Sequence, residues 1–130
     1  MATIGHPLSD MAYLSSMYYL PVTGRALGGL LGLDLPDLGL PTLDQLLTRY
    51  SAGTGVLLPG PYWDFHLGFY YFKGAIIAQG IIARLVKGAA SNDSASAFAI
   101  VVPTFGELAH EAALALRDSL SQGSSTQSKL

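Results

Sequence analysis

The stretch from Pro61 to Gly88, PYWDFHLGFYYFKGAIIAQGIIARLVKG, decides the fold of this chain. Pro61 suits a first helical position, because its ring presets φ and its missing N–H would have no intrahelical partner there. Gly88, directly after Lys87, is typical of a helix C-terminus, and no proline lies between the two ends. We therefore expect one long helix over about 61–88.

Apolar side chains cover most of the circumference of this predicted helix. Phe65, Phe69 and Phe72 recur at helical spacing, and further residues widen the apolar surface: Tyr62, Tyr70, Ile76, Ile77, Ile81, Ile82 and Leu85. A helix that is apolar on most sides is surrounded by other helices or crosses a bilayer. A span needs about 20 predominantly apolar residues, and Lys73 and Arg84 interrupt this run. We therefore predict a buried core helix and no transmembrane segment.

One polar stripe remains on the predicted helix. On a wheel of about 100° per residue, four basic side chains fall within one narrow sector: His66, Lys73, Arg84 and Lys87. The stripe is either a solvated face of the domain or a face that binds an acidic ligand. The sequence leaves both interpretations open.

The composition bounds the size of the protein and the nature of its surface. The chain has 130 residues, which is the size of one ordinary domain. Half of the residues are hydrophobic and only 12% are charged, against about a quarter in typical soluble domains. Few charges are therefore available to cover the exterior. We expect some apolar surface to stay exposed, which is typical of a membrane-associated protein, of an oligomer, or of a piece of a larger fold whose partner surface is missing. In the last two cases a second copy of the chain or a partner chain covers the apolar face.

Charge and cysteine content exclude several function classes. The formal net charge is −2 and Lys and Arg together number 7, so we expect no basic patch of the size that nucleic-acid binding requires. The absence of cysteine excludes disulfides and thiolate metal sites. Residues 1–10, MATIGHPLSD, have neither a basic nor an apolar region of the secretory type, so we expect no secretory signal there.

Helical signals also precede the long stretch. Residues 3–20 show a helical pattern that Pro21 ends, and Asp10 lies in or near its first turn, where the helix dipole favours an acid. Residues 22–41 are rich in Gly, Leu and Pro, which predicts an irregular loop. We expect no convincing strand in the chain.

A capping box marks the next helix. Thr42 and Gln45 have the spacing at which each side chain bonds to the backbone N–H of the other, so we predict a helix start there. Gly53 and Gly55 are predicted to end this helix.

A last helical pattern follows the long stretch and meets Pro103, which either kinks or ends the helix. Thr104 and Glu107 form a second capping box, which favours a fresh start that reaches about Leu120. The fold class is therefore all-α, with four or five helices around residues 61–88.

Motifs for metal binding and catalysis are incomplete. Glu107 and His110 have the E-x-x-H spacing of carboxylate-bridged di-iron bundles, but such a site needs two copies and two further glutamates. The only glutamates are Glu107 and Glu111. No second histidine follows at zincin spacing, and no G-x-S-x-G motif occurs. We predict no metal, no cofactor and no catalytic residue in this chain.

Residues 3–14, TIGHPLSDMAYL, resemble a segment of the aminoglycoside-phosphotransferase-like kinases. In that family the segment follows the metal-binding aspartate motif and has the pattern G-D-P-L-x-D-L-A-Y. The similarity is greatest to the kinase-like domain of acyl-CoA dehydrogenase family members 10 and 11. It extends to about residue 120 through shorter motifs: Leu38 to Thr42, Tyr50, Trp63-Asp64-Phe65, Phe72, Ala78-Gln79-Gly80 and Gly88 to Ser91.

This resemblance implies that residues 1–120 are the helical C-terminal portion of a two-lobed kinase fold. That portion supports the catalytic loop and shapes the pocket of the phosphate acceptor. The resemblance implies that Asp10 matches the aspartate that braces the catalytic loop, whereas His6 stands where many relatives have Asp. Related domains phosphorylate small hydroxylated substrates, including hydroxyacyl-CoA.

The catalytic parts of such kinases lie upstream of the matched segment. They are a nucleotide-binding loop, a lysine on the phosphates, a catalytic aspartate and a metal-binding carboxylate. We therefore expect a truncated domain without phosphotransferase activity of its own. The alternative is a non-enzymatic docking or oligomerisation module.

The last ten residues differ in composition from the rest. Residues 121–130, SQGSSTQSKL, are polar, small and without apolar periodicity, which predicts a disordered tail. Ser128, Lys129 and Leu130 form the tripeptide that the peroxisomal import receptor reads. We therefore expect a peroxisomal protein whose C-terminus binds that receptor.

Overall fold

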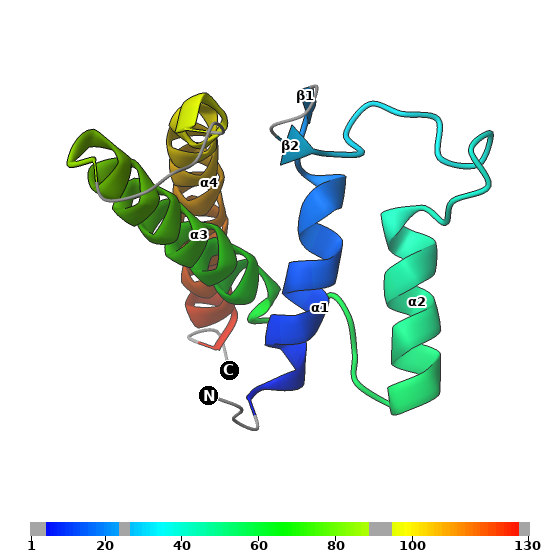
Figure 1. The fold of residues 1–130 in the computed structure, drawn as a ribbon. Helices are drawn as coiled ribbons and strands as arrows, with labels where there is room; N and C mark the ends of the chain where they lie inside the picture. Colours follow the sequence, from blue (N-terminus) through cyan, green and yellow to red (C-terminus); the bar gives the residue numbers. More distant parts are fainter. Residues whose placement is uncertain (1–4, 24–26, 89–94, 128–130) are drawn as a thin grey trace. The chain divides into compact units, whose positions relative to one another are not determined.

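The computed structural model describes residues 5–23, 27–88 and 95–127. Within these ranges the elements follow one another as shown in Figure 1: α1 (Pro7–Ser15), the 3₁₀ helix η1 (Ser16–Tyr18), β1 (Val22–Thr23), β2 (Leu27–Gly28), α2 (Leu43–Thr54), α3 (Trp63–Val86) and α4 (Ala95–Gln127). The two strands have two residues each and pair antiparallel. The all-α class is therefore confirmed, although we expected no strand.

The chain divides into two compact units, of which the first spans residues 1–63. Its first helix, predicted over residues 3–20, begins at Pro7 and ends at Ser15, where the 3₁₀ helix η1 follows. The backbone N–H of Leu8 donates to Nδ1 of His6 at 3.3 Å, and Pro7 occupies the first turn of α1. Asp10 also lies in this turn and is exposed, where the positive end of the helix dipole favours a carboxylate.

The segment between α1 and α2 makes close contacts with its own backbone. The N–H of Leu30 donates to the carbonyl of Met17 at 2.8 Å, and the N–H of Leu31 donates to that of Leu20 at 3.0 Å. A Cβ on Gly29 would collide with the carbonyl oxygen of Leu20. Only glycine allows the backbone at position 29 to come this close to the backbone of Leu20. Part of the irregular loop predicted over 22–41 is therefore held in place by contacts between backbone atoms.

The predicted capping box of α2 is confirmed. The N–H of Gln45 donates to Oγ1 of Thr42 at 3.2 Å, and the N–H of Thr42 donates to Oε1 of Gln45 at 2.9 Å. The helix ends at Gly55, whose φ of 74° is the left-handed conformation that favours glycine at a C-terminus. Gly53 lies inside the helix.

The second unit spans residues 64–130 and contains nearly all of α3 and the whole of α4. α3 is two residues shorter at each end than the predicted range of 61–88. Pro61 was predicted at the first helical position but lies in a turn that precedes the helix. The N–H of Trp63 closes this turn by donating to the carbonyl of Gly60 at 3.0 Å. Gly88 ends α3 as predicted, with φ 68°.

The prediction that α3 is buried on most sides is wrong. One stripe is buried, formed by Trp63, Leu67, Tyr71 and Ala78. Five other large apolar side chains of α3 are between 49% and 56% exposed: Phe65, Phe69, Phe72, Ile76 and Ile77. In the described part of its own unit α3 packs against a single helix, and one neighbour covers only one side of a rod.

Two helical segments are long and apolar enough, by length and composition alone, to cross a membrane. They are α3 and the part of α4 from Phe98 to Ser121. Core helices of soluble proteins have the same length and hydropathy, so this property does not distinguish the two environments. The predicted absence of a transmembrane segment stays a prediction.

α4 is continuous through Pro103, so the predicted restart at Thr104 is wrong. The hydroxyl of Thr104 donates to the carbonyl of Ile100 at 2.9 Å and does not cap a new helix. An interior proline removes one backbone hydrogen bond and crowds the preceding turn, and the burial of Phe105 two residues later offsets that cost.

The structure also differs from the predicted disordered tail. α4 extends to Gln127, so residues 121–127 are helical. A helix that has already formed gains a backbone hydrogen bond with each added residue and needs no second nucleation step. Ser128, Lys129 and Leu130 lie outside the described residues.

Candidate functional site

α3 and α4 lie side by side in the second unit (Figure 1) and are joined by an aromatic cluster. The ring of Phe105 is buried and lies edge-on to that of Tyr71, with centroids 5.3 Å apart. Its centroid is 6.0 Å from that of Tyr70. Gly74 makes room for this ring, because a Cβ there would lie 2.5 Å from Cδ2 of Phe105. The cluster therefore fixes the distance between the two helices at this point.

From this cluster toward the start of α3, the two helices form an apolar groove of about 420 Å³. Small residues from both helices line it together with larger side chains: Gly68, Ala75, Gly106, Ala109, Ala113, Phe65, Phe69, Phe72 and Leu116. A Cβ on Gly68 would lie 3.2 Å from Cβ of Ala112. The helices nearly touch there because their facing residues are small.

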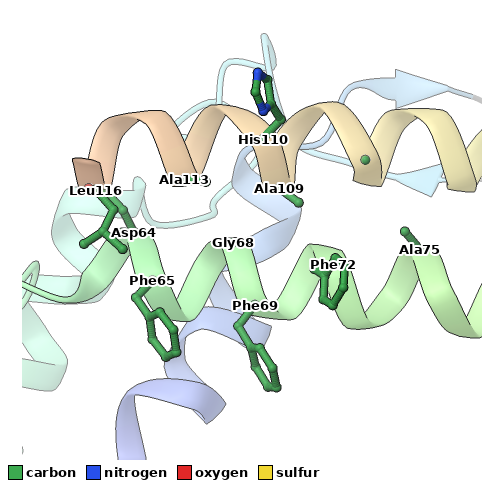
Figure 2. A pocket seen from close by; sticks show the side chains of 11 residues that line it. Asp64, Phe65, Gly68, Phe69, Phe72, Ala75, Ala109, His110, Ala113 and Leu116 are labelled. Atoms are coloured by element: carbon green, nitrogen blue, oxygen red, sulfur yellow. The ribbon is translucent and has the colours of Figure 1, made fainter. Parts of the chain in front are cut away.

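Two polar residues, Asp64 and His110, complete the lining of the groove. In Figure 2 the His110 ring extends from α4 away from α3, and Phe65 and Phe69 extend from α3 away from α4. The groove is therefore an apolar contact surface. The directions of these side chains do not assemble an acid–base pair inside it.

The basic stripe predicted on the long helix lies on one sector of α3 and its C-terminal turn. Lys73, Arg84 and Lys87 are exposed, whereas His66 is half-buried and its ring lies edge-on to Phe65 at 5.4 Å. An ion pair joins Arg117 and Asp118 on α4 at 2.9 Å. We call Lys73, Arg84 and Lys87 the cation strip. Binding of an acidic ligand to it stays a prediction.

A row of exposed apolar side chains borders the cation strip. We call Phe65, Phe69, Phe72 and Ile76 the aromatic row, and the first two rings stack with centroids 6.1 Å apart. The sequence showed the helical spacing of these residues but not their exposure. The signal for the groove beside them was present as small residues in series on α4: Gly106, Ala109 and Ala113.

The other predicted site residues lie apart from this groove or on its edge. Asp10 belongs to the first unit, and its role as a brace of a catalytic loop stays a prediction. Glu107 and His110 lie one turn apart on α4 and are both exposed. Within residues 5–23, 27–88 and 95–127, no three acidic or histidine side chains are placed to hold a metal ion.

Comparison with known proteins gives matches among curated sequences alone. No protein-family model matches the chain, and no solved structure matches it. The chain is 36% identical over 107 residues to human "Acyl-CoA dehydrogenase family member 11", and the match covers 82% of this chain and 14% of that protein.

Two further relatives have similar coverage. Mouse "Acyl-CoA dehydrogenase family member 10" is 33% identical over 109 residues, which is 84% of this chain and 10% of that protein. "Probable acyl-CoA dehydrogenase IBR3" of Arabidopsis thaliana is 27% identical over 120 residues, which is 85% of this chain and 14% of that protein. The chain thus spans between 10% and 14% of the length of these relatives. It is homologous to a part of acyl-CoA dehydrogenase family members 10 and 11.

Proposed function

We propose that this chain is a helical portion of an aminoglycoside-phosphotransferase-like domain, related to kinases that act on small substrates of the hydroxyacyl-CoA type. The observation that carries the proposal is the homology to acyl-CoA dehydrogenase family member 11 over 82% of the chain. The kinase-like assignment within that homology rests on the resemblance of residues 3–14 to the segment after the metal-binding motif of such kinases.

We also propose that the chain alone has no phosphotransferase activity. Phosphoryl transfer needs a nucleotide-binding loop, a lysine on the phosphates and carboxylates that hold Mg²⁺. The acidic residues are dispersed: Asp10 lies on α1, Asp44 on α2, Asp64 on α3 and Glu107 on α4. They do not gather into a magnesium site in the part of the chain that the structure describes.

A direct assay tests this proposal. The purified chain is incubated with ATP, Mg²⁺ and a panel of hydroxyacyl-CoA substrates, with an active kinase of the aminoglycoside type as positive control. We expect no turnover above the blank. Reproducible turnover that Asp10→Asn abolishes would contradict the proposed inactivity. A crystal structure in which α1 to α4 superpose on the substrate-side lobe of such a kinase would confirm the kinase-like assignment.

The aromatic row favours a second candidate function, docking or oligomerisation within the peroxisome. An exposed apolar surface of this kind promotes association with a second copy or with a partner chain. Sedimentation and light scattering of the purified chain test this candidate. A species larger than the monomer supports it, and a clean monomer at high concentration that binds no apolar dye contradicts it.

We further propose that Ser128, Lys129 and Leu130 direct the protein to peroxisomes by binding the import receptor. A free terminal carboxylate preceded by a small, a basic and a leucine side chain is captured through hydrogen bonds and a pocket. Deleting Leu130 from a chain that is fluorescently tagged at its N-terminus should move it from peroxisomes to the cytosol. A wild-type tagged chain that is already cytosolic would contradict the assignment.

A further inference from the structure

α3 presents an exposed apolar surface and an exposed cationic surface next to each other. The aromatic row occupies about 60° of the helix circumference, and the cation strip borders it on one side. The side chains of both groups are exposed. Asp64, the only acidic residue of α3, lies in its first turn and outside the row. This face therefore combines apolar and positive character with little negative charge.

An orientation across a bilayer does not suit these helices. Lys73 lies near the middle of α3, and Glu107 and Glu111 lie near the middle of the apolar part of α4. Ionisable side chains at the centre of a bilayer are costly. An orientation in the plane of the surface removes this cost, because long basic side chains then reach the headgroups while aromatic rings enter the acyl boundary.

The positive charges of the cation strip oppose the association of two copies of the chain through this face of α3. An antiparallel pair of α3 helices joined by their aromatic rows would bring the two cation strips to the same side of the interface. Juxtaposed like charges oppose such a contact. A negatively charged surface complements the cation strip, and a lipid surface also accepts the aromatic row.

We propose that the exposed face of α3 binds the surface of an anionic bilayer, with the aromatic row at the acyl boundary and the cation strip at the lipid phosphates. This inference rests on the docking function proposed above and names its partner. Lys73, Arg84 and Lys87 supply the attraction to negative headgroups, and Phe65, Phe69 and Phe72 supply the buried apolar area.

Vesicle flotation of the full chain tests the inference. The chain is mixed with phosphatidylcholine vesicles that do or do not contain phosphatidylserine, at low and at high salt. We expect binding to the vesicles that contain phosphatidylserine, and we expect this binding to fall as salt screens the cation strip. Equal binding to both vesicle types without salt dependence would overturn the role of the cation strip.

Variants at exposed positions separate the two contributions. Phe69→Ser and Phe72→Ser should each weaken binding about tenfold or more, because a buried aromatic side chain contributes at least that factor. The double variant Lys73→Glu with Arg84→Glu should weaken it at least about 25-fold on vesicles that contain phosphatidylserine. Leu114→Ser, on the part of α4 outside the groove, is the matched control and should change binding less than about twofold.

Circular dichroism of each variant checks that its helical content is unchanged. If a variant does not fold, the lipid and salt dependence measured with the wild-type chain still tests the inference. A chain that forms dimers but binds no vesicle would overturn this inference and leave the docking function standing. A chain that remains monomeric and binds no vesicle would overturn both.

Discussion

Residues 1–63 and residues 64–130 are both helical, but different contacts stabilise the two units. The first unit relies on backbone contacts and caps, such as the box of Thr42 with Gln45 and the approach of Gly29 to Leu20. The second unit relies on one side-chain cluster around Phe105. The stability of the first unit therefore depends on the positions of single backbone atoms. The stability of the second depends on how well apolar side chains fill the space between two helices.

The difference also explains which unit exposes a candidate binding surface. In the first unit, short elements fold back on one another and bury Leu8, Met11 and Leu47. In the second, two long helices meet along one stripe and leave the aromatic row outside it. A pair of helices cannot bury all sides of an apolar rod, so the surplus apolar surface appears on α3.

The largest expected effect is in the aromatic cluster of the second unit. Phe105→Ala should lower the free energy of unfolding by about 3–5 kcal/mol, because it removes a buried ring and leaves a cavity beside Tyr71. Urea denaturation followed by circular dichroism measures the change. Leu114→Ala is the control on the same helix, since this side chain is 37% exposed. Equal effects of the two substitutions would contradict the assigned role of the cluster.

Trp63 allows the same experiment to compare the units. It is the only tryptophan of the chain, it is buried, and its Nε1–H donates to the hydroxyl of Tyr19 at 3.3 Å within the first unit. If Phe105→Ala shifts the circular dichroism transition but not the Trp63 fluorescence transition, the units unfold separately. A common shift would show that they unfold together.

The next effect tests the backbone packing of the first unit. Gly29→Ala should destabilise that unit by about 3 kcal/mol, because the added Cβ meets the carbonyl oxygen of Leu20 and backbone yields less readily than a side chain. Trp63 fluorescence in urea measures the loss. Gly28→Ala is the matched control, since no atom lies within 4 Å of a Cβ at that position. A loss below about 1 kcal/mol for Gly29→Ala would show that this segment adjusts freely.

A pair of substitutions within α3 should have opposite signs. Gly74→Ala should lower the free energy of unfolding by about 1–3 kcal/mol, because its Cβ would push against the ring of Phe105. Gly80→Ala should raise it by about 0.5–1 kcal/mol, because alanine favours the helix and no atom lies within 4 Å of its Cβ. Urea denaturation of both variants gives the comparison. A stabilising Gly74→Ala would mean that the Phe105 ring moves aside without cost.

The sequence predicted features that a few neighbouring residues determine. The box of Thr42 with Gln45 and the end of α3 at Gly88 involve atoms within one helical turn, so their signals are local. The position of Asp10 in the first turn of α1 is local in the same sense.

Features that depend on distant contacts could not be read in the same way. Thr104 with Glu107 has the spacing of a capping box, yet α4 continues through Pro103, because neighbouring turns and the burial of Phe105 outweigh the local signal. The apolar spacing of Phe65, Phe69 and Phe72 was visible, but their exposure depends on how many helices surround α3. The groove likewise requires knowledge of which helix faces Gly68.

The smallest expected effect is at the start of α2, where a single cap is removed. Thr42→Ala should lower the free energy of unfolding by about 1 kcal/mol, because the N–H of Gln45 loses the hydroxyl oxygen that accepts its hydrogen bond. The other bond of the capping box, from the backbone N–H of residue 42 to Oε1 of Gln45, then remains without its reciprocal bond. Trp63 fluorescence in urea again reports on the unit. Thr48→Ala, an exposed position inside the same helix, is the control and should be neutral or slightly stabilising, since alanine is the better helix former. A loss with Thr48→Ala as large as that with Thr42→Ala would mean that threonine stabilises α2 through something other than its cap.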